Sequence, residues 1–461
     1  MKKILVLTLA LAMGVVAPRL AGAMTGGKKV FDQSNNRGHV QVFTKYNGSF
    51  RYMVEDGLLR AWTDDGASRR AHLSLILAPS AKKALVVGPG AGAAVEAALF
   101  HGVESVDVVM NNPLVLNASR LVAEKYANAL SDSRVKIIYA DPAKWLDNPK
   151  GQYDQVFLWS SVFKPEEMGR HLSYDSLLKA KKLLNPGGAV TLWIPMGLYD
   201  GDQFKSALAA FSRVFPAVSL WAPEMTPDLG WALLIGSESG MRVDLARTKE
   251  QLTRMMDSYR FIERDNVASF LSFYVSSEEE LKEALLKGKI AIKPLSGAKL
   301  PDWKSGGNIS RENYRFMIRL RTPISSRTNA NEEEAKRLDD YFTARTRMIE
   351  GRLVHKTQEG GKEIGFYDEA LKSAPDDPHL GQLYQMLGKA YFLSNLPKKA
   401  AHLLEKAKAI NPNHAATRYY LGKSYEAMTR YEKASPEYQK LKELEPNFME
   451  TLSVIGMELD E

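Results

Sequence analysis

The stretch Ala84–Pro113, "ALVVGPGAGAAVEAALFHGVESVDVVMNNP", decides the fold class of this 461-residue chain. It reads as an apolar strand, a glycine-rich turn, an alanine-rich helix and a second apolar strand. Gly88, Gly90 and Gly92 stand between the first strand and the helix, where a turn without Cβ atoms lets backbone N–H groups and the helix N-terminus approach a ligand. Such a turn also occurs where nothing binds, so the glycines define a fold element and leave its ligand open.

Strands and helices alternate along residues 82–237. Short apolar runs separated by helical stretches are typical of a mostly parallel sheet that helices cover on both faces. The expected strands are Ala84–Val87, Ser105–Val109, Val135–Tyr139, Gln155–Trp159, Ala189–Ile194 and the run "GWALLIGS" that ends at Ser237. The pattern therefore predicts an α/β domain over 81–240.

A smaller β unit is expected before this domain, at 38–80. Apolar and polar residues alternate there around two turn signals, Asn47-Gly48 and Asp56-Gly57, and a short helical run follows. Residues 24–37 are rich in Gly, Lys and Asn, and the sequence predicts a loose segment for them.

The C-terminal part is built from repeats. "LGKAY" begins at Leu387 and "LGKSY" at Leu421, and a weaker first repeat begins near Tyr341. The same offset relates two further residue pairs, Ala400 with Ala434 and Pro412 with Pro446. A period of about 34 residues, with small residues at helix contacts and Pro at the junction, where it would begin the next helix, is the tetratricopeptide pattern. We predict an α-solenoid over 341–461 whose groove binds a peptide or a partner protein.

Between these regions, residues 241–340 alternate helical patterns with Gly- and Pro-rich stretches, and we expect a helical connector with long loops there. The predicted fold class is therefore α/β: a small N-terminal β unit, a Rossmann-like domain, a helical connector and a tetratricopeptide-type solenoid.

The N-terminal segment 1–23 has the features of a secretory signal peptide. Lys2 and Lys3 form a short basic end, Ile4–Val16 is apolar, and Ala21–Ala23 offers a small-x-small cleavage site. An uncleaved membrane anchor is the alternative, but the apolar run is short for a bilayer span. We expect an exported bacterial protein, periplasmic or extracellular, with no stable transmembrane segment after cleavage.

Composition narrows the classes of function. The chain has no cysteine, which excludes disulfides and thiolate catalysis, and its 8 histidines show no metal-binding spacing. The formal charge is +8, yet Lys and Arg are mixed with Asp and Glu along the whole chain. We therefore expect neither a metal site nor a nucleic-acid partner.

Several motifs occur in a fixed order around the glycine turn. They are "RYMVEDGLLR" (51–60), "NALSDSRVKIIYAD" (128–141), "YDQVFLWSSVF" (153–163), "LNPGG" (184–188) and "WALLIGS" (231–237). In this order and spacing, from about Phe50 to Ser237, the chain resembles the spermidine synthase family, aminopropyltransferases built on a methyltransferase-type Rossmann fold. The resemblance implies a site for an S-adenosylmethionine-like nucleoside at Gly88, Gly90, Gly92, Asn112 and Asp141.

The resemblance also implies that the acidic groups of that site are missing here. Family carboxylates that hold the ribose correspond to Met110 and Asn112, and a loop acid corresponds to Ala91. Two aspartates of the fourth strand correspond to Trp159 and Val162. The family's Gln after the Asp-Gly turn corresponds to Arg60, whose charge would repel a polyamine or a sulfonium. We therefore assign no catalytic residue and no required cofactor.

Four polar residues also have possible structural roles. Asp141 would either contact a nucleobase or cap the helix that begins "PAKWL". His72, near the family's Tyr-His-Glu run, fits a structural histidine better than a ligand. Tyr153-Asp154 is expected to open the fourth strand without a catalytic role.

The sequence leaves three functions open. The preferred hypothesis is a non-catalytic, exported protein that acts as an interaction scaffold or a ligand sensor through its repeats. The alternative is an aminopropyl or methyl transferase with an altered substrate. A third hypothesis keeps nucleoside binding without catalysis.

Overall fold

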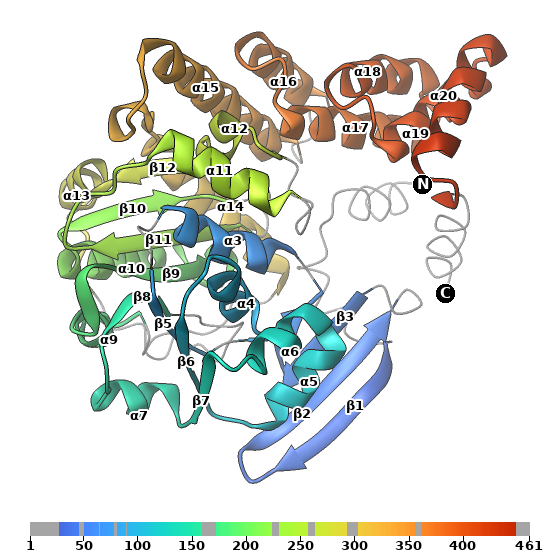
Figure 1. Cartoon of the computed structure of the whole chain (residues 1–461). Helices are drawn as coiled ribbons and strands as arrows, with labels where there is room; N and C mark the ends of the chain where they lie inside the picture. The colour runs from blue at the N-terminus through green and yellow to red at the C-terminus, as the bar shows by residue number, and fades with distance from the viewer. Residues whose placement is uncertain are drawn as a thin grey trace. The chain divides into compact units, whose positions relative to one another are not determined.

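The computed structural model describes residues 27–45, 50–63, 65–77, 81–88, 90–158, 172–223, 230–256, 263–292, 303–355 and 361–448. The chain divides into two compact units (Figure 1). The described residues of the first, the sheet unit, lie within 27–256 and 273–335, and those of the second, the repeat unit, within 263–272 and 336–448. The predicted signal peptide lies outside the described residues.

The sheet unit is built on one large sheet. Its strands are β5 (Lys83–Val87), β6 (Ser105–Met110), β7 (Val135–Tyr139), β8 (Tyr153–Leu158), β9 (Leu184–Pro195), β10 (Ala217–Trp221), β11 (Trp231–Ser237) and β12 (Tyr274–Ser277). They lie in the order β12-β10-β11-β9-β8-β5-β6-β7. Strands β5 to β9 pair in parallel, whereas β11 runs antiparallel to both β9 and β10. The predicted α/β class is confirmed.

The order of the strands reverses next to β5. From β5 the chain proceeds outward to β6 and β7, and then returns to the other side of β5 as β8. In open α/β sheets the ligand crevice lies at such a reversal, outside the carboxyl ends of the strands. The glycine turn follows β5 directly, and it therefore lies at this position of the fold.

The helices of the sheet unit form two groups. They are α3 (Asp65–Leu77), α4 (Ala93–Phe100), α5 (Leu114–Val122), α6 (Glu124–Leu130), α7 (Pro142–Asp147), α9 (Tyr174–Lys181), α10 (Gly201–Val214), α11 (Leu245–Met255), α13 (Glu278–Lys287) and α14 (Trp303–Arg319), with 3-10 turns η2 (Met196–Leu198) and η3 (Ser325–Arg327). Helix α4 packs with α3 and α6, and α3 packs with α11; α10 packs with α9, α13 and α14. The right-handed crossovers from β5 to β6 and from β8 to β9 run in opposite directions along the sheet, and they place these two groups on opposite faces.

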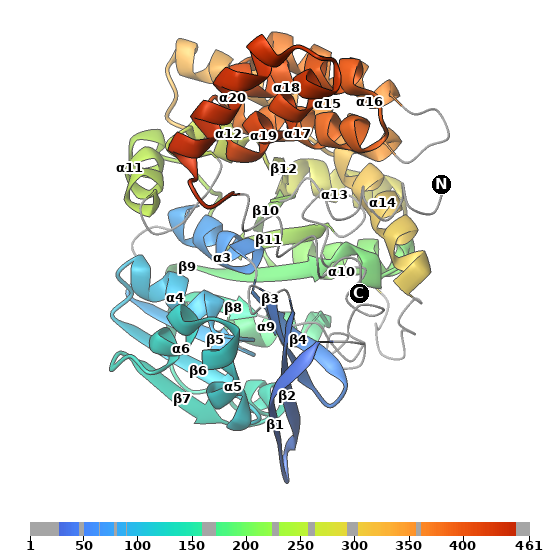
Figure 2. The same cartoon turned by 90° about the vertical axis from the view of Figure 1, so that its right-hand side faces the viewer.

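A separate four-stranded antiparallel sheet precedes the large one. It comprises β1 (Lys28–Asn35), β2 (Gly38–Lys45), β3 (Phe50–Glu55) and β4 (Leu58–Trp62), in that order. The predicted turn at Asp56-Gly57 joins β3 to β4, with φ angles of 51° and 78°; Asn47-Gly48 lies outside the described residues. Strands β1 to β3 contact α5 (Figures 1 and 2).

Strand β1 corrects the prediction of a loose segment at 24–37. All its residues but Phe31 are exposed, and β1 is an edge strand that pairs only with β2. A strand with no buried face is not constrained to alternate apolar and polar residues. The sequence of β1 therefore lacks the period-2 signal that indicated β2 and β3.

Residues 241–340, expected as a helical connector, are divided between the units. Strand β12 adds to the edge of the large sheet by antiparallel pairing with β10. The short helix α12 (Val267–Leu271) belongs instead to the repeat unit. The repeat unit is thus discontinuous in sequence.

A buried ion pair and a buried carboxylate–histidine contact bind the α12 segment, residues 263–272, within the repeat unit. Arg345 and Asp377 lie 2.9 Å apart, and both side chains are fully buried. The Ser269 hydroxyl donates to Asp377 at 3.0 Å, and Arg345 Nε donates to the Ser272 hydroxyl at 2.8 Å. Glu263 also pairs with the buried His379. The α12 segment is therefore an integral part of this unit.

The remaining helices of the repeat unit follow the predicted period. They are α15 (Glu332–Val354), α16 (Lys362–Ser373), α17 (Pro378–Leu393), α18 (Pro397–Ile410), α19 (Ala415–Ala427) and α20 (Tyr431–Leu444). Helix α17 packs on α18 and α19 on α20. The prediction that Pro412 begins a helix is wrong: Pro412 lies in the loop before α19, and the His414 side chain caps that helix. Pro378 and Pro397 do stand at helix starts.

The repeated glycines lie where paired helices approach most closely. A Cβ atom on Gly388 would lie 2.5 Å from Leu404 Cγ, and one on Gly422 would lie 2.6 Å from Tyr438 Cε1. These distances are far below van der Waals contact. The recurrence of glycine at the same position of successive repeats therefore records one packing constraint that occurs twice.

Gly422→Ala is expected to lower the free energy of unfolding by about 1–3 kcal/mol, because the added methyl group overpacks the α19–α20 contact. Gly365→Ala, in the exposed part of α16, is the matched control: nothing lies within 4 Å of its Cβ position. That variant should be neutral or more stable by about 0.5–1 kcal/mol. Urea titrations followed by circular dichroism compare the two, and equal effects would refute the close-approach explanation.

Candidate functional site

The glycine turn has the backbone conformation that only glycine adopts readily. Gly88, Gly90 and Gly92 have φ angles of 73°, 55° and 108°. Gly88 N donates to Val109 O at 2.9 Å, which ties the turn to the end of β6. A Cβ on Gly92 would lie 2.9 Å from Tyr126 O on α6. The predicted strand–turn–helix is present, with Gly92 as the N-cap of α4.

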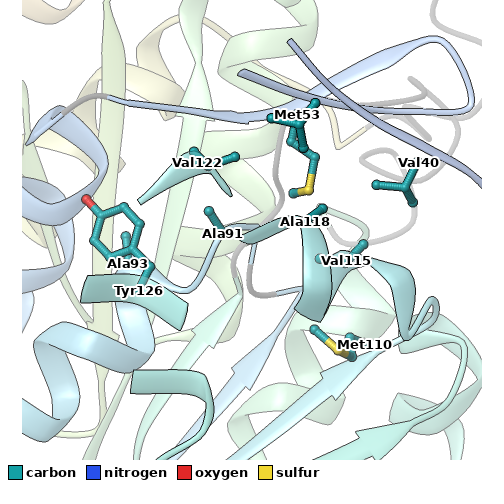
Figure 3. Packing of buried hydrophobic residues seen from close by; sticks show 10 residues of the cluster. Val40, Met53, Ala91, Ala93, Met110, Val115, Ala118, Val122 and Tyr126 are labelled. Atoms are coloured by element: carbon teal, nitrogen blue, oxygen red, sulfur yellow. The ribbon is translucent and has the colours of Figure 1, made fainter. Parts of the chain in front are cut away.

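Two of the positions expected to have lost carboxylates lie in a hydrophobic core. Met110 is 3% exposed and Ala91 is 6% exposed. They belong to one cluster of buried residues, most of which are labelled in Figure 3: Val40, Val42, Met53, Ala91, Ala93, Met110, Val115, Ala118, Val122 and Tyr126. The cluster joins the small sheet to α5, α6 and the glycine turn. A carboxylate at either position would be removed from water without a cationic partner among the residues of the cluster.

Asn112, the third such position, is buried and hydrogen-bonded to the small sheet. Its Oδ1 accepts from Asn35 Nδ2 at 3.0 Å and from Leu114 N at 3.1 Å. Arg37 Nη1 donates to Asn111 O at 2.7 Å. The Asn112 Nδ2 atom is buried and has no partner among the described residues. The acceptor of this amide is thus already used within the fold.

Asn35 and Arg37 are site residues that the sequence analysis missed. Both lie at the β1–β2 turn, in the segment expected to be loose. Their partners Asn112 and Asn111 follow them by 77 and 74 residues, and no local pattern indicates contacts over such a separation.

Asp141 caps α7, which is one of the two roles predicted for it. Its Oδ1 accepts from Lys144 N at 3.0 Å, and Pro142 follows at the first helical position. The carboxylate is only half-buried. The capping contact uses one of its oxygens, and contact with a nucleobase stays a prediction.

The structure does not describe the side chains at the remaining positions of the predicted site. Trp159 and Val162 lie outside the described residues. Arg60 stands in β4, but the structure does not describe its side chain.

His72 has the structural role expected for it. It is fully buried, its Nδ1 lies 3.0 Å from His101 Nε2, and the rings of Phe100 and His101 pack edge-on against it. Burial, with the neighbouring His72 as a further cause, lowers the pKa of His101 to about 3. The imidazole of His101 is therefore neutral, and it packs against the buried His72.

Tyr153 and Asp154 also have structural roles. The Tyr153 hydroxyl donates to Asp107 Oδ2 at 2.7 Å. Asp154 accepts from the backbone N–H groups of Lys82 and Lys83 and from the Asn185 amide. Burial opposes ionisation of Asp154, yet these hydrogen bonds prevail and its pKa is lowered. The pair fixes the start of β8, as predicted.

The described part of the chain lacks two further kinds of feature. Within it, no group of three or more His, Asp or Glu side chains is arranged to hold a metal ion. Within the same residues, no helix has both the length and the apolar character that a bilayer crossing requires.

Comparison with known proteins gives two family matches. The Spermine/spermidine synthase domain family matches residues 68–245. The family described as Anaphase-promoting complex, cyclosome, subunit 3 matches residues 363–441. The first match contains the glycine turn, and the second lies within the repeats.

Individual relatives agree with the first match. The Polyamine aminopropyltransferase of Caldicellulosiruptor bescii is 27% identical over 208 residues, which are 43% of this chain and 74% of that protein. That of Thermotoga petrophila is 27% identical over 172 residues, or 36% and 58%. Spermidine synthase 2 of Hyoscyamus niger is 27% identical over 195 residues, or 40% and 62%. The aligned segment thus spans less than two thirds of the last two proteins.

The solved structure of spermidine synthase from Thermotoga maritima aligns with 46% of this chain and 73% of its own, at 21% identity and a TM-score of 0.41. The two family matches confirm the resemblance inferred from the sequence motifs. The chain contains a spermidine synthase domain followed by a tetratricopeptide-type repeat region.

Proposed function

We propose that this protein is exported and non-catalytic, and that it acts as an interaction scaffold or a ligand-sensing module through its repeats. The burial of Met110 and Ala91 in one apolar cluster carries the proposal. Transfer of an aminopropyl group from a sulfonium nucleoside to an amine needs carboxylates that hold the ribose and accept a proton. A closed apolar cluster at these positions supplies neither function.

Two further features support the proposal. The repeat region offers a surface for protein partners, since stacked helical repeats form extended binding surfaces. The basic, apolar and small-residue order of the segment 1–23 favours export. S-adenosylmethionine is made in the cytosol and should be scarce outside it, so an exported protein would rarely meet that cofactor.

A transferase with an altered substrate is the alternative function. The intact glycine turn favours it, as does the buried Asn112 Nδ2 atom, which offers an unused donor at the end of β6. An amide can hydrogen-bond a ribose hydroxyl, although without the charge of a carboxylate.

A nucleoside titration distinguishes the two functions. Calorimetry on the mature protein with S-adenosylmethionine, its decarboxylated form and methylthioadenosine should show no binding up to millimolar concentration. Micromolar binding that Gly90→Val or Asp141→Ala abolishes would overturn the proposal in favour of the transferase. Gly92→Val is unsuitable, because a side chain at Gly92 would collide with α6.

The scaffold function has its own test. Deleting 341–461 would remove the buried partners of the α12 segment and expose that segment, so a point variant is the better test. Arg345→Met should unfold the repeat unit at a temperature where the sheet unit persists. Partners cross-linked to the full-length protein in envelope extract should be lost at that temperature. Recovery of every partner from the unfolded repeats would refute the scaffold.

A further inference from the structure

Lys389 of α17 is a partly buried lysine that has no carboxylate partner in the described part of the chain. The Lys389 ammonium lies 5.2 Å from the centre of the Tyr420 ring on α19. Among the described residues, no carboxylate forms an ion pair with it. Burial alone lowers the pKa of this group. A cation removed from water in this way is unfavourable unless an anion compensates for it.

Other partly buried lysines of the repeat unit show the usual arrangement. Lys406 pairs with Asp368 at 2.6 Å, Lys408 with Glu437 at 2.9 Å, and Lys423 with Glu426 at 2.8 Å. Their side chains are 22%, 24% and 36% exposed. Lys389 differs from all three because no carboxylate of the described residues pairs with it.

The surroundings of Lys389 also offer apolar contact. Tyr420 lies 5.9 Å from Phe392 and 5.0 Å from Tyr419, measured between ring centres. Phe392 and Tyr419 are half-buried, and the Phe448 ring lies 5.5 Å from that of Tyr419. Lys423 is the lysine of "LGKSY" and occupies the position of the next repeat that corresponds to Lys389 in "LGKAY". We call these residues, Lys389, Phe392, Tyr419, Tyr420 and Lys423, the lysine–aromatic face.

We propose that the lysine–aromatic face binds an acidic peptide segment of a partner protein, with one carboxylate of that segment against the Lys389 ammonium. The rings then contact the apolar parts of the same segment, and Lys423 can exchange its exposed partner Glu426 for a second acidic side chain. This inference rests on the proposed scaffold function and names the chemistry of its partner.

A peptide titration tests the face directly. The probe is a short fluorescein-labelled peptide of alternating Glu and Leu, with matched Gln–Leu and Lys–Leu peptides, and anisotropy is measured with the full-length protein. The Glu peptide should bind and the other two should not. Lys389→Met keeps the apolar stem without the charge and should weaken binding by at least ~10-fold, about 1.4 kcal/mol. Lys389→Arg should retain binding.

Lys398→Met is the matched control, since it removes an equal charge from an exposed site on α18 and should leave the affinity unchanged. Thermal melts separate binding from folding: Lys389→Met should be as stable as wild type or more so, because it removes an uncompensated charge. Three outcomes would each refute the site. The Lys389→Met variant could bind the Glu peptide as tightly as wild type does, the Lys and Glu peptides could bind equally well, or the Glu peptide could fail to bind. If Lys389→Met still captures every envelope partner, the scaffold function stands and this site alone fails.

Discussion

Arg345→Met is expected to lower the free energy of unfolding of the repeat unit by about 3–5 kcal/mol, because it leaves the fully buried Asp377 carboxylate without its cation. The loss should be specific to this unit. All seven tryptophans lie outside 260–272 and 336–461, so tryptophan fluorescence follows the sheet unit alone. Circular dichroism reports both units, and the difference between the two urea curves isolates the effect.

Arg337→Met is the matched control for this variant. Arg337 pairs with Asp376 at the same 2.9 Å, but both side chains are 57% exposed. An exposed pair contributes at most about 1 kcal/mol. The double variant Arg345→Met with Asp377→Asn should lose less than the sum of the two single variants, since the second change removes the stranded charge. Equal losses for Arg345→Met and Arg337→Met would contradict the importance of burial.

Met110→Glu is expected to destabilise the sheet unit by about 3–5 kcal/mol, because it places an unpaired carboxylate in the apolar cluster. The variant restores the acidic residue that the spermidine synthase resemblance implies at this position. Burial should raise the pKa of the introduced carboxyl above its unfolded value of about 4.3. The stability loss should therefore be larger at pH 7 than at pH 5, by up to about 1.4 kcal/mol per pH unit.

Met256→Glu provides the comparison, since Met256 is 40% exposed beyond α11 and the substitution should change stability by less than about 0.5 kcal/mol at either pH. Tryptophan fluorescence in urea measures both variants. The proposed function predicts no nucleoside binding by Met110→Glu. A stable Met110→Glu protein that gains nucleoside affinity would show that the site is open, and would favour the transferase.

The sequence predicts the elements that local chemistry determines. Gly88, Gly90 and Gly92 indicate the turn because each adopts a positive φ, and Gly388 and Gly422 indicate the repeat because a Cβ at either would strike the facing helix. In both cases one residue type satisfies the constraint, so the pattern is visible in a single sequence.

Contacts between distant segments are what the sequence does not reveal. Asn35 and Arg37 lie in a strand and turn whose exposed residues carry no alternation, yet they contact Asn112 and Asn111. The α12 segment reads as part of a connector, because the polar partners that bind it lie 108 and 73 residues away in sequence. The missing acids at Met110 and Ala91 were visible in the sequence, but the apolar cluster that replaces them was not.

The discontinuity of the repeat unit has a consequence for the order of events during synthesis. The ribosome releases Ser269 long before Arg345 and Asp377, which follow it by 76 and 108 residues. Until those residues emerge, the α12 segment lacks the ion pair to which it binds. The repeat unit can therefore complete its folding only after α17 has begun to emerge, and a chain that stalls before Asp377 presents an unfinished α12 segment to chaperones and proteases.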